Sequence, residues 1–171
     1  MKKAGKAVLS LVELSWSWLG GFVGMGAVGY AGQWLALHEF DRLFLIGSFG
    51  ASAILLYGAP TVPYSQPRNV LGGHILSALV GVAVWQHQPG SLWLTGALAV
   101  SCSMAAMQIT RTLHPPGGAT ALIAVAGDSR IHDLGYLYAL APVGLGAAIM
   151  LLVALVVNNA PPSRRYPLTW W

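Results

Sequence analysis

Charged residues are scarce in this sequence: they make up 8% of its 171 residues, while hydrophobic residues make up 56%. A soluble domain normally contains about 25% charged residues, because its surface must stay in water. So small a share cannot cover a water-facing surface, whereas a chain surrounded by lipid needs no such cover. The composition therefore indicates a polytopic membrane protein, with the lipid bilayer as its first partner.

Cysteine is almost absent as well. Cys102 stands alone, which excludes an intramolecular disulfide and a cysteine-based metal cluster, and we expect it to be a small buried apolar residue. His114 has no acidic residue or second histidine at metal-ligand spacing, so neither a metal nor a cofactor is expected. The basic residues form no patch or stripe, which argues against a nucleic-acid partner.

Long apolar runs are what the sequence does have. A full helical span needs about 20 apolar residues. The first run follows Lys2, Lys3 and Lys6, but Glu13 interrupts it, which favours a retained first span over a cleaved signal peptide. We expect six crossings, two of them incomplete as helices, at residues 15–37, 43–57, 69–85, 92–110, 114–126 and 134–157.

The distribution of charge predicts the orientation. With six crossings and both termini cytoplasmic, most basic residues fall on the cytoplasmic side and most acidic residues on the far side, as the positive-inside rule requires. We therefore expect one multi-pass domain in a cell membrane, which would be the inner membrane in a bacterium. Residues 1–14 form its cytoplasmic N-terminal segment, and residues 158–171 form a cytoplasmic tail.

The two short segments resemble each other. The sequence GASAIL at 50–55 matches GATALI at 118–123, and an arginine precedes each at a similar distance. Each half would hold a long span, a broken span and another span. Since three crossings is an odd number, the second repeat (residues 92–157) must be inverted relative to the first (residues 15–85). The prediction is an all-helical bundle of 3+3 inverted repeats.

Broken helices in such halves point to a transport site. Pro115 and Pro116 suit the first turn of a helix, where their missing N–H groups are not needed. Two half-helices, beginning near Ser48 and near Pro116 or Gly117, would place their N-termini face to face near the bilayer midplane. Such ends carry a partial positive charge and suit a small anion. Glycines at 47, 50, 117 and 118 would let it approach the backbone, and Ser48, Ser52 and Thr120 would supply hydroxyls.

Three ordered motifs resemble the HPP family of integral membrane proteins: GSFGASAILLYGAP at 47–60, QPRNVLGGH at 66–74 and HPPGGATAL at 114–122. The similarity covers most of the chain from about Arg42 to Leu155. It implies a multi-span helical protein, usually described with fewer than six spans. From the photosynthetic members of the family, it also implies nitrite transport across a membrane.

Single residues allow more than one interpretation. His114 either orders the proline turn or faces a cavity, where its imidazole binds an anion or carries a proton. Arg68 and Arg111 either orient the chain or turn inward toward the pathway, and His74 is either structural or part of the site. We take the following as candidate substrate-binding residues: Gly47, Ser48, Gly50, Ser52, Arg68, His74, Arg111, His114, Gly117, Gly118 and Thr120.

Three functions remain open at this point. The first is a transporter or channel for a small monovalent anion, most of all nitrite. The second is an intramembrane hydrolase with a dyad of Ser48 and His114, and the third is a non-transporting scaffold or subunit. The glycine series 20, 24, 26, 29 and 32 predicts close packing of the first span, either inside the molecule or in a homo-oligomer.

Overall fold

The computed structural model describes residues 10–34, 44–87 and 90–171, and within these ranges every regular element is a helix. The predicted all-helical fold is confirmed. The elements are α1 (Leu11–Trp34), α2 (Gly47–Ala53), η2 (Ile54–Gly58), η3 (Pro63–Ser65), α3 (Pro67–His87), α4 (Leu92–Ile109), α5 (Pro115–Ala126), α6 (Ser129–Leu134), η4 (Ala139–Gly144) and α7 (Leu145–Val157). The charged loop at 38–42 lies outside the described residues.

Among the described residues, four helical segments are long and apolar enough to cross a membrane: α1, α3, α4 and Ala139–Val157, which is kinked at Ala141 (φ −141°, ψ 127°). Several boundaries differ from the prediction; α3, for example, extends from Pro67 to His87 rather than from 69 to 85. Helix α1 begins at Leu11 and so includes Glu13, whose carboxylate is paired with Arg164. The last span begins at Ala139 rather than at 134, because Gly135 has a φ of 50° and ends α6 there.

The two short apolar segments form helices of equal length, Gly47–Gly58 (α2 and η2) and Pro115–Ala126 (α5). Both begin within two residues of the predicted starts. When they are aligned from Gly47 with Pro115 to Gly58 with Ala126, every pair of positions has the same degree of burial. The buried residues of the first helix are Ser48, Phe49, Ser52, Ala53, Leu56 and Tyr57, and their counterparts in α5 are Pro116, Gly117, Thr120, Ala121, Ala124 and Val125.

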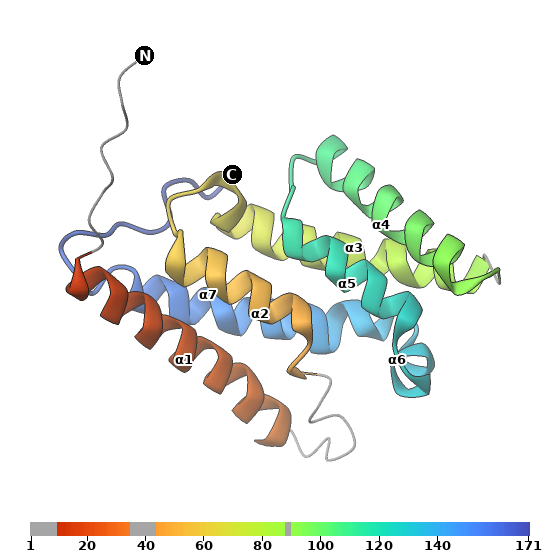
Figure 1. Ribbon diagram of the computed structural model, residues 1–171, viewed down its shortest axis with the longest axis horizontal. Coiled ribbons are helices and arrows are strands. Elements are labelled where there is room, and N and C mark those ends of the chain that lie inside the picture. The colour runs from red at the N-terminus through yellow and green to blue at the C-terminus, as the bar shows by residue number, and fades with distance from the viewer. Residues whose placement is uncertain (1–9, 35–43, 88–89) are drawn as a thin grey trace.

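The helices pack around the two short ones. Helix α3 lies against α5, α4, η4 and α7, whereas α1 lies against α7, α2 and η2, and α2 touches α5. Figure 1 shows that α1 and α3 run in one direction along the long axis of the molecule, while α4 and α7 run in the other. It also shows α2 and α5 starting near the middle of the view and running in opposite directions.

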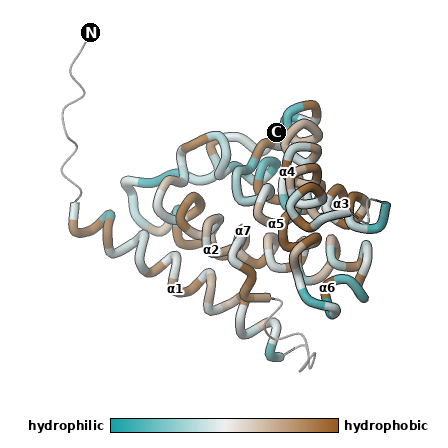
Figure 2. Tube along the Cα trace, turned by 45° about the vertical axis from the view of Figure 1, so that its right-hand side comes forward, coloured by the Kyte–Doolittle hydropathy of each residue, from teal (hydrophilic) through white to brown (hydrophobic). Residues whose placement is uncertain are grey.

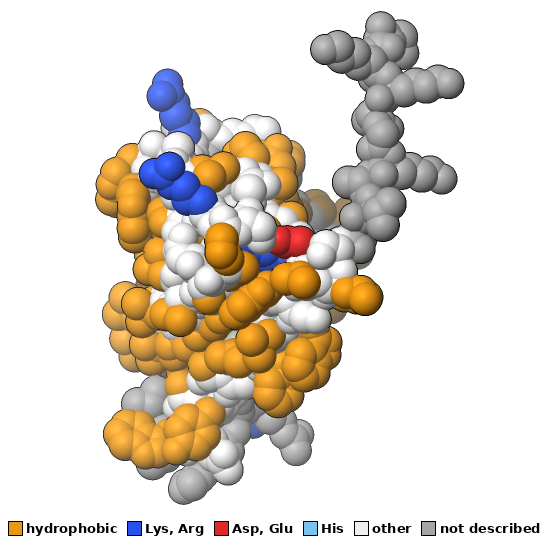
Figure 3. All heavy atoms as spheres, turned by 90° about the vertical axis from the view of Figure 1, so that its left-hand side faces the viewer, with side chains coloured by type: hydrophobic (Ala, Val, Ile, Leu, Met, Phe, Trp, Pro, Cys, Tyr) orange, Lys and Arg blue, Asp and Glu red, His pale blue; other side chains and the backbone are white. Residues whose placement is uncertain are grey.

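The outer surface is apolar, as a membrane protein requires. Large hydrophobic side chains such as Trp18, Phe22 and Leu152 are exposed, and Figure 3 shows hydrophobic side chains over much of one face. In Figure 2 the hydrophilic stretches gather at helix ends and connections. Cys102 was expected to be buried, and that expectation is wrong: it is exposed on α4.

Glycines of α1 pack inside the molecule. A Cβ added to Gly24 would lie 2.1 Å from Oη of Tyr57, and one added to Gly20 would lie 2.7 Å from Cδ1 of the same ring. Gly32 meets Phe44 in the same way, at 3.0 Å. Nothing lies within 4 Å of a Cβ at Gly26. Internal packing therefore accounts for most of the glycine series, and self-association through α1 stays a prediction.

Candidate functional site: a buried chain of hydroxyls and imidazoles

The QPRNVLGGH motif begins α3 and holds the turn between α4 and α5. Arg68 Nη2 donates to the carbonyl of Thr110 at 2.7 Å, and Asn69 Nδ2 donates to the carbonyl of Leu113 at 2.8 Å. Gly73 lies so close to this turn that an added Cβ would be 2.5 Å from Cβ of His114. The motif thus packs against the α4–α5 turn and stabilises it, and this contact positions His114 at the start of α5.

Four buried side chains meet beside this turn. Ser52 Oγ of α2 lies 2.7 Å from Nε2 of His74 and 2.8 Å from Nε2 of His114. His74 Nδ1 lies 2.8 Å from Oγ1 of Thr120, and His114 Nδ1 lies 2.7 Å from the carbonyl oxygen of Tyr64. These contacts form one continuous series, which we call the hydroxyl–imidazole chain: Tyr64 O, His114, Ser52, His74 and Thr120.

The carbonyl at one end sets the direction of every hydrogen bond. Tyr64 O can only accept, so His114 Nδ1 carries a proton, and Nε2 of the neutral ring accepts from the Ser52 hydroxyl. The single proton of Ser52 is then used, and His74 Nε2–H must donate to Ser52 Oγ. His74 Nδ1 therefore accepts from the Thr120 hydroxyl. With both imidazoles neutral, every ring nitrogen and both hydroxyls are paired.

The hydroxyl–imidazole chain is inaccessible to solvent. Ser52, His74, His114 and Thr120 are each 0% exposed. The two imidazole rings lie edge to face with centroids 4.8 Å apart, and Phe49 also packs edge to face with His74, with centroids 5.3 Å apart. Buried polar groups persist in an apolar interior only when they are hydrogen-bonded, and this series meets that condition without a charged side chain.

The predicted glycines divide into two groups. Gly117 is a packing residue, since an added Cβ would lie 2.7 Å from Oγ of Ser77 and 2.9 Å from the carbonyl oxygen of Gly73. Gly47 is exposed and Gly50 partly so, on the side of α2 away from Ser52, and an added Cβ meets nothing within 4 Å. Gly118 is partly exposed, with Val100 as its nearest neighbour at 3.7 Å. None of the four contributes a hydrogen bond to the hydroxyl–imidazole chain.

The two predicted arginines lie near the end of α4. Arg68 donates to the carbonyl of Thr110, the C-cap residue that follows that helix. Arg111 is exposed, with a φ of 56°. It ends α4 in a left-handed turn, in which Arg111 N donates to the carbonyl of Gln108 and Thr112 N donates to that of Met107. Both arginines therefore belong to the turn that ends α4, and neither contacts the hydroxyl–imidazole chain.

Ser48 does not form the predicted dyad with His114. It is 0% exposed, and among the described residues its Oγ is the buried side-chain polar atom that has no hydrogen-bond partner. Ser52, not Ser48, contacts His114. Because Ser48 precedes Ser52 by one helical turn, both lie on the same buried side of α2. Ser48 therefore offers an unused O–H donor next to the chain.

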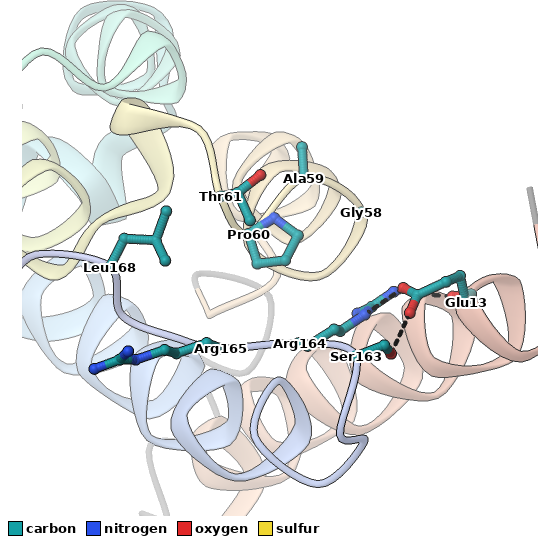
Figure 4. A pocket seen from close by; sticks show the side chains of 9 residues that line it. All are labelled: Glu13, Gly58, Ala59, Pro60, Thr61, Ser163, Arg164, Arg165 and Leu168. Carbon is teal, nitrogen blue, oxygen red and sulfur yellow. Dashed lines mark hydrogen bonds and ion pairs between the residues drawn. The ribbon is translucent and has the colours of Figure 1, made fainter. Parts of the chain in front are cut away.

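The carbonyl end of the Gly47–Gly58 helix is held by side chains from elsewhere. The carbonyl of Leu56 accepts from Asn158 Nδ2 at 2.8 Å, and that of Tyr57 accepts from Arg164 Nη1 at 3.1 Å. Arg164 also pairs with Glu13 of α1, at 2.6 Å. Figure 4 shows Arg164, Ser163 and Glu13 together in a pocket of about 420 Å³ at this end. A helix can stop inside the protein only if such orphan carbonyls are satisfied.

Sequence reasoning missed three contributors to this region. Tyr64 enters through its backbone carbonyl, which no side-chain pattern can reveal. Tyr138 donates from Oη to the carbonyl of Thr120 at 3.3 Å, from a part of the chain expected to be an ordinary span. Asn69 was not among the candidate residues, although Gly72 and Gly73 in the same motif signal a close backbone approach at that place.

Comparison with known proteins identifies a family and two relatives. The model of the HPP transmembrane region matches residues 6–167. Over 164 residues the chain is 42% identical to one transmembrane protein of Dictyostelium discoideum and 44% identical to a second one from the same organism. These alignments cover 94% of this chain but 52% and 57% of the relatives, so the chain spans about half of their length. No solved structure matches.

Proposed function

Because the chain belongs to the HPP transmembrane family, we propose that it is a transporter or channel for a small monovalent anion, with nitrite as the first substrate to test. The printed names of its relatives say only that they are transmembrane proteins. The observation that carries the proposal is the buried hydroxyl–imidazole chain, which joins two half-length helices of opposite direction.

An inverted repeat supports a transport site at this place. We propose that α1, Gly47–Gly58 and α3 form one repeat, and that α4, α5 and Ala139–Val157 form the other. The identical burial of the two short helices supports this division, as do their opposite directions. The packing is also paired: α1 lies on α7 as α4 lies on α3, and α1 lies on η2 as α4 lies on α5. Six crossings follow from it and put both termini on one side of the membrane, which we take to be the cytoplasmic side from the distribution of basic residues.

The nature of the site favours an anion over a cation. Carboxylates are the usual partners of cations in a membrane interior, and the described acidic residues, Glu13, Asp128 and Asp133, lie at the ends of the molecule on α1 and around α6. The site instead offers hydroxyls and imidazoles. It also lies at the first turns of α5, where a helix carries partial positive charge.

Not all of the expected backbone donors are available. Pro115 and Pro116 have no N–H, and the N–H of Gly117 donates to the carbonyl of His114. Side chains must therefore supply most of the hydrogen bonds to a dehydrated anion. We assign this role to Ser48, Ser52, His74, His114 and Thr120, and we place Gly47, Gly50, Gly117, Arg68 and Arg111 outside the first layer of contacts.

The test is nitrite uptake into liposomes that hold the purified full chain, with formate, nitrate, chloride and urea as competitors. Saturable uptake that anions inhibit and urea does not would support the proposal. In Thr120→Val, which replaces the hydroxyl with a methyl group of similar size, uptake should fall at least tenfold. In Thr110→Val, at the exposed end of α4, it should stay within twofold of the unmodified protein. Folded protein without flux of any of these anions would overturn the proposal in favour of a scaffold.

A hydrolase is the second candidate, now centred on Ser52. Its hydroxyl donates to Nε2 of His114, and Tyr64 O holds the other nitrogen of that ring, which is the order of groups in a nucleophile–base pair. Against it, Ser52 Oγ also accepts from His74 and lies inside a helix whose backbone N–H groups are used by the helix. Labelling of Ser52 by a serine-reactive phosphonate would support the hydrolase, and Ser52→Ala is the control.

A further inference from the structure

The hydroxyl–imidazole chain has a second arrangement in which all its groups are also paired, and this arrangement holds one more proton. If a proton reaches Thr120 Oγ1, the Thr120 proton passes to Nδ1 of His74. The Nε2 proton of His74 passes to Ser52 Oγ, and the Ser52 proton passes to Nε2 of His114. His114 becomes an imidazolium. The new hydroxyl proton of Thr120 then points at the carbonyl of Pro116, which lies 3.4 Å away.

The balance of this transfer is complete. Four O–H or N–H bonds form, at Thr120, His74, Ser52 and His114, and three break, at the first three of these, so the net change is the gain of one proton. No donor or acceptor of the chain is left without a partner in either arrangement. A buried network that stays satisfied in two protonation states can therefore hold or release a proton without exposing an unpaired group.

No charge near the chain compensates the added proton. Among the described residues, the groups that the structure places against its side chains are uncharged: the carbonyls of Tyr64 and Pro116 and the aromatic ring of Phe49, while the phenol of Tyr138 donates to the carbonyl of Thr120. The remaining titratable or charged side chains on the elements packed against α3, α5 and α2 lie elsewhere. Tyr57 is bonded to Met150, Arg68 to Thr110, Arg130 to Asp128 and Arg164 to Glu13, and the others lie at helix ends or on outer surfaces: Tyr30, His87, Cys102, His132 and Asp133.

An isolated buried cation is strongly unfavourable. A monovalent anion next to the imidazolium removes this penalty, and the imidazolium in turn supplies the attraction that a neutral site lacks. Ser48, buried with an unused hydroxyl one turn from Ser52, provides a further donor for the anion. Binding of the proton and binding of the anion must then strengthen each other by the same factor.

We propose that the protein carries one proton with each anion, and that the chain from Thr120 through His74 and Ser52 to His114 holds this proton. This inference rests on the proposed anion transport and adds its coupling. A neutral pair of anion and proton crosses the site, so transport is electrically silent. A pathway that moves the anion alone would instead carry charge.

The experiment uses the full chain in liposomes, with nitrate and nitrite as separate probes. Nitrous acid crosses lipid unaided, so protein-free liposomes are measured in parallel and subtracted. For coupled transport, an interior more alkaline by one pH unit should accumulate the anion about tenfold, and a potassium diffusion potential should have no effect. Accumulation of about tenfold per ~59 mV of potential, without response to the pH gradient, would overturn the coupling and leave anion transport intact. Absence of all anion flux would overturn transport and coupling together.

A second measurement does not depend on flux. Adding nitrite to lightly buffered protein in detergent should take up about one proton per bound anion, which a pH indicator reports as alkalinisation. In His114→Gln the uptake should be lost, whereas in His87→Gln, at the exposed end of α3, it should be unchanged. Anion binding without proton uptake in the unmodified protein would contradict the proposal, whatever the variants do.

Discussion

Ser52 and Thr120 lie on opposite sides of one imidazole ring: Ser52 Oγ is 2.7 Å from Nε2 of His74, and Thr120 Oγ1 is 2.8 Å from its Nδ1. The two hydroxyls occupy matching positions in the GASAIL and GATALI segments. A similarity between two short stretches of sequence thus corresponds to a shared contact with a single residue of α3. That contact makes the similarity meaningful beyond the chance matching of small apolar residues.

Removal of the Ser52 hydroxyl should be costly. In Ser52→Ala, the Nε2–H of His74 and the Nε2 acceptor of His114 both lose their partner in a site closed to water. We expect a loss of about 2–6 kcal/mol in the free energy of unfolding, since each of the two unsatisfied buried groups costs about 1–3 kcal/mol. Thermal unfolding in detergent measures the change.

Two variants control this prediction. Ser52→Thr keeps a hydroxyl, as Thr120 does at the matching position of GATALI, and should retain most of the stability. Ser101→Ala removes an exposed hydroxyl of α4 that bonds only within its own helix, and it should change the melting temperature little. Equal melting temperatures for Ser52→Ala and Ser101→Ala would contradict the assigned hydrogen bonds.

The glycines of α1 provide a matched pair. Gly24→Ala would place a Cβ 2.1 Å from Oη of Tyr57, and Tyr57 would have to move and lose its hydrogen bond to the carbonyl of Met150. We expect a loss of about 1–3 kcal/mol or more from this overpacking. At Gly26 the added methyl meets nothing, and the higher helix propensity of alanine should raise stability by up to about 1 kcal/mol. A loss at Gly26 comparable to that at Gly24 would show that α1 packs against a second copy through Gly26.

The sequence predicted the helical class and the starts of the two short helices, because prolines, glycines and apolar runs act locally. It also singled out Ser52, His114 and Thr120, which the structure brings into one hydrogen-bonded series, while their role in substrate binding stays a prediction. It could not decide the role of His74. On sequence grounds that residue lies one turn into an apolar helix, where most histidines are structural. Its position between two hydroxyls depends on how α3 packs against α2 and α5, and such packing has no signature in the local sequence. The outward position of Gly47 and Gly50 was missed for the same reason.

Arg111 tests whether a predicted site residue acts through its charge or its backbone. A non-glycine residue in the left-handed region costs about 1 kcal/mol, so Arg111→Gly should raise stability by about that amount while keeping the turn that ends α4. Arg111→Ala also removes the charge but retains the Cβ, and no gain is expected. Anion uptake should persist in both variants. If both variants fold but lose uptake, the charge of Arg111 takes part in the anion pathway.

Arg164 should be among the most important residues for stability, although it lies far along the chain from the helices it joins. Its guanidinium donates to Glu13 and Ser17 of α1, to the carbonyl of Tyr57 and to Asn158, and its side chain is only 6% exposed. Arg164→Ala leaves the carbonyl of Tyr57 and Oδ1 of Asn158 without this donor, while Glu13 keeps a hydrogen bond from Ser163 Oγ, and we expect a loss of about 2–4 kcal/mol.

A lysine at position 164 cannot replace the forked geometry of the guanidinium, so Arg164→Lys should recover only a small part of this loss. The neighbouring Arg165 is exposed and serves as the control: Arg165→Ala should change the free energy of unfolding by less than about 0.5 kcal/mol. The melting temperature in detergent compares the three variants. Similar values for Arg164→Ala and Arg165→Ala would mean that the C-terminal segment does not hold the end of the Gly47–Gly58 helix. In α5 the corresponding contact is made by His132, whose Nε2 lies 3.3 Å from the carbonyl oxygen of Val125. The carbonyl ends of the two half-length helices are therefore held by different residues, and the Arg164 variants test only the first helix.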